Sequence, residues 1–453
     1  MKLSAMQIQA IVDATKTPTP EQVRVVEAPR RPLLVVAGAG SGKTETMSMR
    51  VLWLLANHPD LTPASILGLT FTRKAAGELG DRLRERIRLL SREMPQMRER
   101  LDEDPVALTY NSFAERIVSE HGMRIGIDPD FAMLSEAGAL DLMTQIVEAW
   151  PTDLDETLSP AGVVGKILHL AGEIAEHGYT VETAREALEE FGRELEQLWR
   201  GNDVSRNVID ANRRRLAFLG PIEAYQQRKR DMGVLDFSDQ LVLATRIVRE
   251  APAVRAALRD EFLAVLLDEF QDTSVIQMEL LSTLFGDHAV TAVGDPNQAI
   301  YGWRGASASS LETFLERFQT GVAEEDQTLT LSTAWRNDVS ILDAANRVAA
   351  PLREVASYQQ GKDALKAQSP VLVPRPGAGQ GTVEIAYTQA YDQALAAMVD
   401  FVQRVRSQPV KDGKRRTVAV LSRRRKDFPL IDAALREAGI PTEIVGLGGL
   451  LEQ

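Results

Sequence analysis

The segment Leu33–Thr44, LLVVAGAGSGKT, constrains the fold of this 453-residue chain more than any other segment. Its apolar run Leu33–Val36 ends in β-branched valines and predicts a buried strand. A glycine-rich turn follows, and then a helical pattern from Glu45 to Ala56. Small residues let consecutive backbone N–H groups converge on phosphate oxygens, and the following helix directs its positive end toward them. The segment therefore predicts a phosphate-binding loop in an α/β fold.

Two side chains at the end of this loop have specific expected tasks. Lys43 would reach the β- and γ-phosphates of a nucleotide, and the Thr44 hydroxyl would complete the shell of a Mg²⁺ ion. A plain glycine turn between a strand and a helix is the alternative, but it does not need Gly-Lys-Thr at the helix start. Alanine stands at the first position, where the usual pattern has glycine, and alanine is also small. The residues expected to contact the nucleotide phosphates are Ala37, Gly38, Ala39, Gly40, Ser41, Gly42, Lys43 and Thr44.

Composition narrows the class of protein further. Hydrophobic residues make up 44% and charged residues 26% of the chain, an ordinary globular balance, and the length allows roughly three domains. The net charge of −12 argues against a generally basic nucleic-acid coat, so a nucleic-acid site would be a local groove or a stacking surface. The chain has no cysteine, and we find no signal peptide and no apolar run long enough to span a membrane. We therefore expect a cytoplasmic protein without a membrane partner.

Adjacent carboxylates follow a second apolar strand. Asp268 and Glu269 come directly after Phe262–Leu267, where buried charge is costly unless it has a partner or a task. Beside a phosphate loop, Asp268 can hold Mg²⁺, and Glu269 can orient and deprotonate an attacking water. A helix N-cap with an acidic first turn is the alternative interpretation. After the next strand, Ala289–Val293, Gln298 could touch the γ-phosphate or the attacking water.

Aromatic and basic residues follow other strands. Phe71 and Arg73 come after the strand Ile66–Thr70, at the edge where open parallel sheets bind ligands. Phe71 could stack on a base and Arg73 could meet a phosphate, although a core phenylalanine and a solvated cap are the alternative. The arginines that follow are spaced around a helix and predict a solvated face; they are Arg82, Arg84, Arg86 and Arg88.

A second aromatic segment follows Gln298. Tyr301 and Trp303 are two residues apart, so in an extended segment they share one face. With Arg304 beside them they predict a stacking platform for bases, since the glycines around them keep the segment open. Burial of both aromatic side chains in a hydrophobic core is the alternative.

The rest of the chain predicts a helical insertion and a second α/β block. Residues 114–230 have a helical pattern, and their basic cluster Gln226–Arg230 reads as a solvated face. A strand over Leu329–Leu331 precedes Arg336, a candidate γ-phosphate contact from across a cleft. Further on we expect helices over Tyr391–Arg406 and Phe428–Gly439, and strands over Val383–Ala386, Val418–Leu421 and Thr442–Val445.

Taken in order, these motifs resemble the UvrD/Rep family of superfamily 1A DNA helicases. The segments that carry the resemblance are TPTPEQ, AGAGSGKT, TFTRKAA, TYNSF, LLDEFQDT, VGDPNQAIYGWRGA and TAWRN. The variants GKTETM and GLTFTRKAA are most similar to actinobacterial helicases of the helicase–nuclease type. Many family members have arginine after the threonine of the phosphate loop, where this chain has Glu45, so this position departs from the family pattern.

The resemblance assigns roles to individual residues. It implies that Gln22 contacts adenine, that Lys43 and Thr44 bind phosphate and Mg²⁺, and that ATP is the nucleotide. Asp268 and Glu269 would be the Mg²⁺-binding and general-base carboxylates. Gln298 and Arg336 would sense the γ-phosphate, and the residues on single-stranded DNA would be Phe71, Tyr301, Trp303 and Arg304.

The resemblance also implies an architecture. It predicts a RecA-like P-loop domain formed by residues 1–113 and 231–325, a helical insertion over 114–230, and part of a second RecA-like domain over 326–453. The family continues with a threonine–histidine–lysine–glycine motif, a large insertion and a further motif whose arginine enters the ATP site, and none of these occurs here. We therefore expect a fragment or a truncated form that binds nucleotide, hydrolyses it poorly and does not unwind duplexes alone.

For a full-length relative, the implied activity is ATP-dependent translocation on single-stranded DNA from 3′ to 5′, coupled to unwinding in repair or recombination. Single-stranded DNA, duplex junctions and a nuclease domain or subunit are the expected partners. A nucleotide-dependent DNA-binding subunit without motor activity is the alternative. A P-loop kinase or GTPase fits less well, because it has no use for the aromatic segment at Tyr301 and Trp303.

Overall fold

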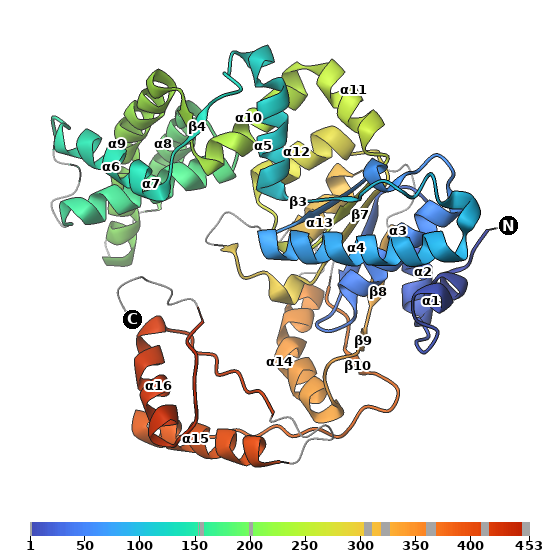
Figure 1. The fold of residues 1–453 in the computed structure, drawn as a ribbon. Coiled ribbons are helices and arrows are strands. Elements are labelled where there is room, and N and C mark those ends of the chain that lie inside the picture. Colours follow the sequence, from blue (N-terminus) through green and yellow to red (C-terminus); the bar gives the residue numbers. More distant parts are fainter. Residues whose placement is uncertain are drawn as a thin grey trace. The chain divides into compact units, whose positions relative to one another are not determined.

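The computed structural model describes residues 2–152, 154, 158–198, 203–302, 310–318, 327–358, 368–408 and 416–445 (Figure 1). The chain separates into two units, residues 1–381 and residues 382–453, and each is described by itself.

A six-stranded sheet forms the centre of the first unit, and all its strand pairs are parallel. The strand order is β3-β2-β6-β7-β1-β8, so strands far apart in the sequence lie side by side. This arrangement confirms the predicted α/β fold with a parallel sheet. The strands are β1 (Leu33–Ala37), β2 (Ile66–Thr70), β3 (Val106–Thr109), β6 (Ala264–Leu267), β7 (Val290–Gly294) and β8 (Thr328–Leu331).

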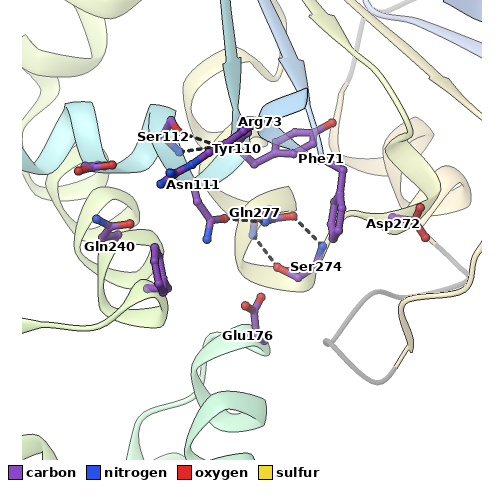
Figure 2. Close-up of a pocket in the computed structure, with 13 residues that line it drawn as sticks. Phe71, Arg73, Tyr110, Asn111, Ser112, Glu176, Gln240, Asp272, Ser274 and Gln277 are labelled. Atoms are coloured by element: carbon purple, nitrogen blue, oxygen red, sulfur yellow. Dashed lines mark hydrogen bonds between the residues drawn. The ribbon is translucent and has the colours of Figure 1, made fainter. Parts of the chain in front are cut away.

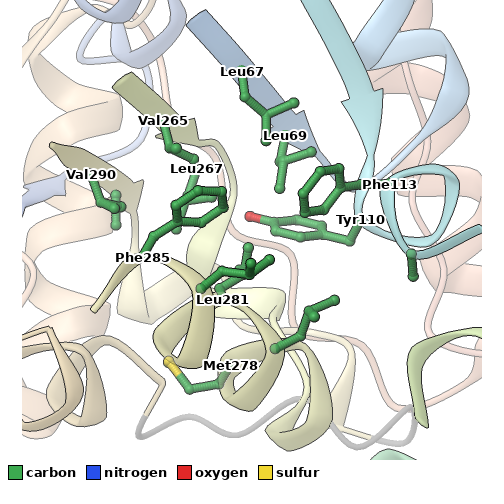
Figure 3. Packing of buried hydrophobic residues seen from close by; sticks show 14 of the residues in the cluster. Leu67, Leu69, Tyr110, Phe113, Val265, Leu267, Met278, Leu281, Phe285 and Val290 are labelled. Atoms are coloured by element: carbon green, nitrogen blue, oxygen red, sulfur yellow. The ribbon is translucent and has the colours of Figure 1, made fainter. Parts of the chain in front are cut away.

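The four inner strands β1, β2, β6 and β7 are buried on both faces, which explains why their residues are mostly apolar. Successive residues of a strand point to opposite faces. In β1, Leu34 and Val36 join one core cluster, while Leu33, Val35 and Ala37 join the other. Figure 3 shows part of the first cluster, where Tyr110 and Phe113 pack against leucines and valines of the strands.

Helices on either face complete these two cores. On one face lie α1 (Ala5–Asp13), α2 (Pro20–Val26), α3 (Lys43–Asn57) and α4 (Arg73–Glu93). The other face is covered by α5 (Tyr110–His121), α10 (Phe237–Glu250), α11 (Pro252–Glu261), α12 (Val275–Phe285) and α13 (Ser310–Arg317). Short 3₁₀ turns occur at Pro63–Ser65, Pro95–Met97, Gly122–Ile125, Phe270–Asp272, Pro296–Gln298 and Arg425–Asp427.

The predicted helical insertion has a hydrophobic core of its own, around Met143, Ile167 and Leu219. Its helices are α6 (Glu136–Glu148), α7 (Pro160–Glu176), α8 (Val181–Gln197) and α9 (Asp203–Met232). Before α6 and after α9, β4 (Ala132–Met133) and β5 (Val234–Leu235) pair in a two-stranded parallel ladder.

The predicted solvated face at Gln226–Arg230 is wrong for Lys229. This side chain is 5% exposed, and its Nζ lies 2.6 Å from a carboxylate oxygen of both Asp236 and Asp239. The Tyr225 ring covers the ammonium at 4.7 Å. A buried lysine is stable only with such partners, and the sequence pattern could not show that they meet it.

The chain beyond β8 forms β9 (Thr333–Ala334), α14 (Val339–Tyr358) and β10 (Val373–Pro374), and β10 pairs with β9. β8 pairs with β1 in the first sheet, although it lies beyond residue 325. Helix α5 likewise continues past residue 113. The division of the chain at these two residues stays a prediction.

The second unit contains α15 (Tyr391–Ser407) and α16 (Phe428–Glu437), close to their predicted ranges. Val402, Leu435 and Ile440 form its small core. The strands predicted over Val383–Ala386, Val418–Leu421 and Thr442–Val445 are wrong, because these segments have irregular backbone. β-branched residues favour a strand only where a neighbouring strand supplies ladder partners, and the described residues of this unit supply none.

In the described parts of the chain, no helix combines the length and apolar character needed to cross a membrane.

Candidate functional site

The candidate site residues of the first unit gather at one edge of the sheet. Apart from Gln22, which lies on α2 before β1, each follows the carboxyl end of a parallel strand. The ends of the six strands meet at the same edge, where open α/β sheets bind ligands. β9, which precedes Arg336, pairs with β10 in a separate ladder. The strand ends lead to the phosphate loop after β1, Phe71 after β2, Tyr110 after β3, Asp268 after β6, Asp295 after β7, and Trp335 and Arg336 after β8 and β9.

The phosphate loop has the backbone geometry of an anion cradle. Gly40 and Gly42 have φ of 73° and 83°, a left-handed conformation that residues with a side chain rarely adopt. Gly42 is the N-cap of α3, so the helix begins at Lys43. Ser41 is 1% exposed, and its Oγ has no hydrogen-bond partner among the described residues. A buried hydroxyl without a partner fits a loop that takes up phosphate oxygens.

Lys43 and Glu269 form an ion pair, with 2.8 Å between Nζ and Oε2. Burial favours a raised pKa for Glu269, but the positive Lys43 outweighs it, so the pKa is lowered and the carboxylate stays charged. Glu269 is also the single described residue other than glycine with a positive φ, at 50°. This strained backbone aims its carboxylate at the lysine.

Asp268 has the opposite electrostatic setting. It is 7% exposed, and its Oδ1 accepts the Glu269 N–H at 3.0 Å. Burial and the negative Glu269 raise the pKa of Asp268 to about 6. At neutral pH this carboxyl is mostly ionised, and its buried negative charge needs a cation to compensate it.

Mg²⁺ bound with a nucleotide would meet this need. The described residues contain no group of three or more His, Cys, Asp or Glu side chains suited to hold a metal ion. Magnesium in phosphate-loop sites takes most of its oxygen ligands from phosphate and water, with only one or two from the protein. Thr44 and Asp268 fit such a shared site, and Lys43 and Ser41 fit the phosphates.

The side of the loop expected to face the base holds Gln22 and Trp335. The Gln22 side chain accepts the Thr19 N–H at 2.9 Å, which fixes its amide at the start of α2. A Cβ placed on Gly42 would lie 3.2 Å from Gln22 Nε2 and 3.7 Å from Trp335 Cδ1, so both side chains adjoin the loop. Trp335 also donates its backbone N–H to Gly40 O at 2.9 Å.

Trp335 is 39% exposed, so part of its ring is open to a ligand beside the loop. Sequence reasoning missed this residue. The only sequence signal was an aromatic residue directly before Arg336.

Arg50 anchors the helix that carries Gln22. Its guanidinium is fully buried and donates to backbone carbonyls of Val25, Val26, Ala28 and Pro29 and to Thr291 Oγ1. Burial lowers the pKa of Arg50 to about 10, so it stays charged at neutral pH. Arg50 thus ties the end of α2 to α3 and β7.

Glu45 has a partner from another helix. Arg86 of α4 donates to Glu45 Oε2 and to Ser48 Oγ, both at 2.5 Å. The Arg86 side chain is only 11% exposed, so the prediction of a solvated arginine face is wrong for this residue. The helical spacing was right, but a tertiary ion pair decides the environment of Arg86.

The predicted γ-phosphate sensors follow β7 and β9. Gln298 Nε2 donates to Asp295 Oδ2 at 2.7 Å. Arg336 lies over the loop, since its Cβ is 3.3 Å from a Cβ placed on Gly40.

The predicted stacking residues Phe71 and Tyr301 lie against each other. Their ring centroids are 4.6 Å apart with 28° between the planes, a stacked pair. Trp303 and Arg304 lie outside the described residues. The rings of this pair must separate before a base can enter between them.

A pocket of about 420 Å³ adjoins Phe71 and Arg73 (Figure 2). Its wall is mostly uncharged and polar, and Gln277 donates to Asn111 across it at 3.3 Å. Phe237 adds a half-exposed ring. The remaining lining residues are Thr109, Tyr110, Ser112, Glu115, Glu176, Gln240, Asp272 and Ser274. The arrangement suits a flexible ligand with rings and hydrogen-bonding edges.

The parallel sheet, the cradle after β1 and the carboxylates after β6 define a RecA-like P-loop protein. Residues 18–319 match the UvrD/REP helicase N-terminal domain, which is more than half of the chain. The chain therefore belongs to the UvrD/REP helicase family.

Individual relatives agree with this assignment. The chain is 30% identical over 327 residues to DNA helicase II of Escherichia coli K12, covering 72% of this chain and 39% of the relative. It is 28% identical over 329 residues to ATP-dependent DNA helicase PcrA of Leuconostoc citreum, covering 72% of this chain and 38% of that relative. The chain thus spans about two fifths of the length of these relatives.

Proposed function

We propose that the chain binds ATP with Mg²⁺ and single-stranded DNA as part of an ATP-dependent DNA helicase with 3′ to 5′ polarity, acting in DNA repair or recombination. The observation that carries the proposal is that two groups of residues lie at one edge of the sheet. Lys43 meets Glu269 at 2.8 Å beside the phosphate cradle, and Phe71 stacks on Tyr301 after a neighbouring strand.

The proposed nucleotide site assigns each residue a task. The loop from Ala37 to Thr44 and Lys43 hold the phosphates, and Thr44 and Asp268 hold Mg²⁺, which when bound neutralises phosphate charge. Glu269 orients the attacking water and accepts its proton, and its lowered pKa keeps it ready as a base. Gln298 and Arg336 contact the γ-phosphate. The base lies between Gln22, which reads its edge, and Trp335, which stacks on its face.

The proposed DNA site relies on stacking more than on charge. A base held by Phe71 and Tyr301, with Arg73 on a phosphate, binds without sequence preference. The net charge of −12 agrees with a local site of this kind. Trp303 and Arg304 extend the site in this proposal.

Binding of two probes to the full chain and to two variants of it tests the proposal. The probes are a fluorescent ATP analogue with Mg²⁺ and an oligothymidylate. Lys43→Met should abolish nucleotide binding while oligothymidylate still binds. Tyr301→Ala should weaken oligothymidylate binding by about 1–3 kcal/mol and leave the nucleotide bound. If both variants bind both probes like the parent, the proposal fails.

Displacement of streptavidin from biotinylated oligonucleotides by the helicase of which the chain is a part tests the polarity. Movement from 3′ to 5′ clears streptavidin from the 5′ end and not from the 3′ end. If both ligands bind but streptavidin stays at both ends and Glu269→Gln changes no biological activity, the chain is a nucleotide-dependent DNA-binding subunit.

We also propose the domain division given above, with the helical insertion over residues 114–230. A nuclease domain or subunit is the proposed partner. The cytoplasm is the proposed location, because it gives access to chromosomal DNA.

A further inference from the structure

Both the nitrogen and the oxygen of the Gln271 side-chain amide form hydrogen bonds between the two proposed binding sites. It is 2% exposed, and its Nε2 donates to Glu269 Oε2 at 2.9 Å and to Asp272 Oδ2 at 3.1 Å. Its Oε1 accepts the Asp295 N–H at 3.1 Å. A flipped amide would turn its oxygen toward two carboxylates, so these partners fix its orientation. Nothing in the nucleotide or DNA roles given above uses this residue.

On one side, this amide leads to the aromatic pair. Asp272 Oδ1 accepts the Ile300 N–H at 3.3 Å, while Oδ2 of the same carboxylate accepts from Gln271. Tyr301, the next residue, stacks on Phe71. A displacement of Tyr301 also moves the neighbouring Ile300, and so changes the position of the Asp272 carboxylate that Gln271 contacts.

On the other side, the amide leads to the nucleotide. Glu269 Oε2 accepts from both Gln271 Nε2 and Lys43 Nζ, at 2.9 and 2.8 Å. A triphosphate that binds Lys43 removes one of these two contacts. Gln271 is then the described side chain that still holds the Glu269 carboxylate.

Close packing keeps Gln271 from adjusting freely. A Cβ placed on Gly294, at the end of β7, would lie 2.8 Å from Gln271 Oε1 and 3.1 Å from its backbone nitrogen. The Gln271 amide is thus closely packed against the end of β7. A movement of the Asp272 carboxylate therefore shifts the Gln271 amide and with it the Glu269 carboxylate.

We infer that Gln271 is a positioning residue that transmits occupancy of the Phe71–Tyr301 pair to Glu269, and so couples DNA binding to nucleotide binding. The inference rests on the proposed function. A base that enters between the two rings shifts Tyr301, the Ile300–Asp272 contact changes, and Gln271 reorients the Glu269 carboxylate beside Lys43. By linkage, nucleotide binding acts on the DNA site to the same extent.

The test measures the coupling ratio, the affinity for the fluorescent ATP analogue with saturating oligothymidylate divided by the affinity without it. For the full chain this ratio should differ from one by about fivefold or more, in line with known allosteric couplings. Gln271→Met has a similar length but makes no hydrogen bonds, so its ratio should fall to one while both probes still bind.

Gln9→Met is the matched control. Gln9 is 4% exposed, and its Nε2 donates to Asp13 O within α1, away from the carboxylates. This variant loses a buried amide and should keep the parent's ratio. Loss of coupling through general destabilisation would appear in both variants.

If Gln271→Met does not fold, Asp272→Asn is used in its place. Its Oδ1 can still accept from Ile300, but its amide nitrogen cannot accept from Gln271, so the ratio should again fall to one. A parent-like ratio in the folded variants overturns the inference, as does a parent that binds both probes with a ratio of one. A parent that binds neither probe overturns the proposed function instead.

Discussion

At the residue scale, neighbouring carboxylates at the end of β6 carry opposite pKa shifts. Lys43 lowers the pKa of Glu269, while burial and Glu269 raise that of Asp268 to about 6. The sequence shows that two adjacent carboxylates follow a buried strand, where their charge is costly unless it has a partner. It does not show which carboxylate meets the lysine, because that depends on the left-handed backbone of Glu269. In the proposed site, this difference separates a base from a cation ligand.

The raised pKa of Asp268 predicts a dependence of stability on pH. Without bound cations, the folded state holds this proton more tightly than the unfolded state, so stability is lost as pH rises between about 4 and 6. Asp268→Asn has no such loss. Between about pH 4 and pH 6, the difference in free energy of unfolding between this variant and the parent should shift by about 3 kcal/mol in favour of the variant. Urea unfolding at several pH values measures the difference, and a constant difference would contradict the assignment.

Trp335 gives a second prediction at this scale. Trp335→Ala should weaken binding of the ATP analogue by about 1–3 kcal/mol, since base–aromatic stacking has this magnitude. Trp335→Phe keeps a ring and should retain most of the affinity. Equal affinities for the alanine variant and the parent in a fluorescence titration would show that the base lies elsewhere.

At the element scale, short helices and strands are placed by a few buried polar contacts. The sequence predicted the strand cores of the sheet and the helix after the loop, because apolar runs and a glycine-rich turn are local signals. It could not predict Arg50 beneath α2, Arg86 on Glu45 or Lys229 between its aspartates. Those contacts join residues that are far apart in the chain, and a charged residue in isolation predicts a solvated face.

Arg50 tests the anchoring of α2. Arg50→Met leaves several buried carbonyls without a donor and should lower the free energy of unfolding by about 3 kcal/mol, given the cost of each unpaired group. Arg88→Met, an exposed arginine on α4, should change it by no more than about 0.5 kcal/mol. Urea unfolding compares the two, and similar small effects would show that Arg50 does not anchor the helix.

At the scale of the whole molecule, one parallel sheet carries both proposed sites of the first unit. The order β3-β2-β6-β7-β1-β8 brings the ends of β1 and β6 near each other through β7, and places Phe71 beside the carboxylates. The motif order in the sequence predicted this shared edge. The sequence wrongly predicted strands in the irregular segments between 383 and 445, because a strand also needs a neighbouring strand as a hydrogen-bond partner. It also gave no sign that Gln271 connects the two proposed sites.

The central claim is that a nucleotide and a DNA strand bind at this edge of one sheet. A crystal structure of the full chain with Mg²⁺, a non-hydrolysable ATP analogue and oligothymidylate tests it most directly. We predict phosphate density over Ser41–Thr44, Lys43 released from Glu269, and a base between Phe71 and Tyr301. If Lys43 stays on Glu269, the two rings stay stacked and both ligands lie elsewhere, the claim is contradicted.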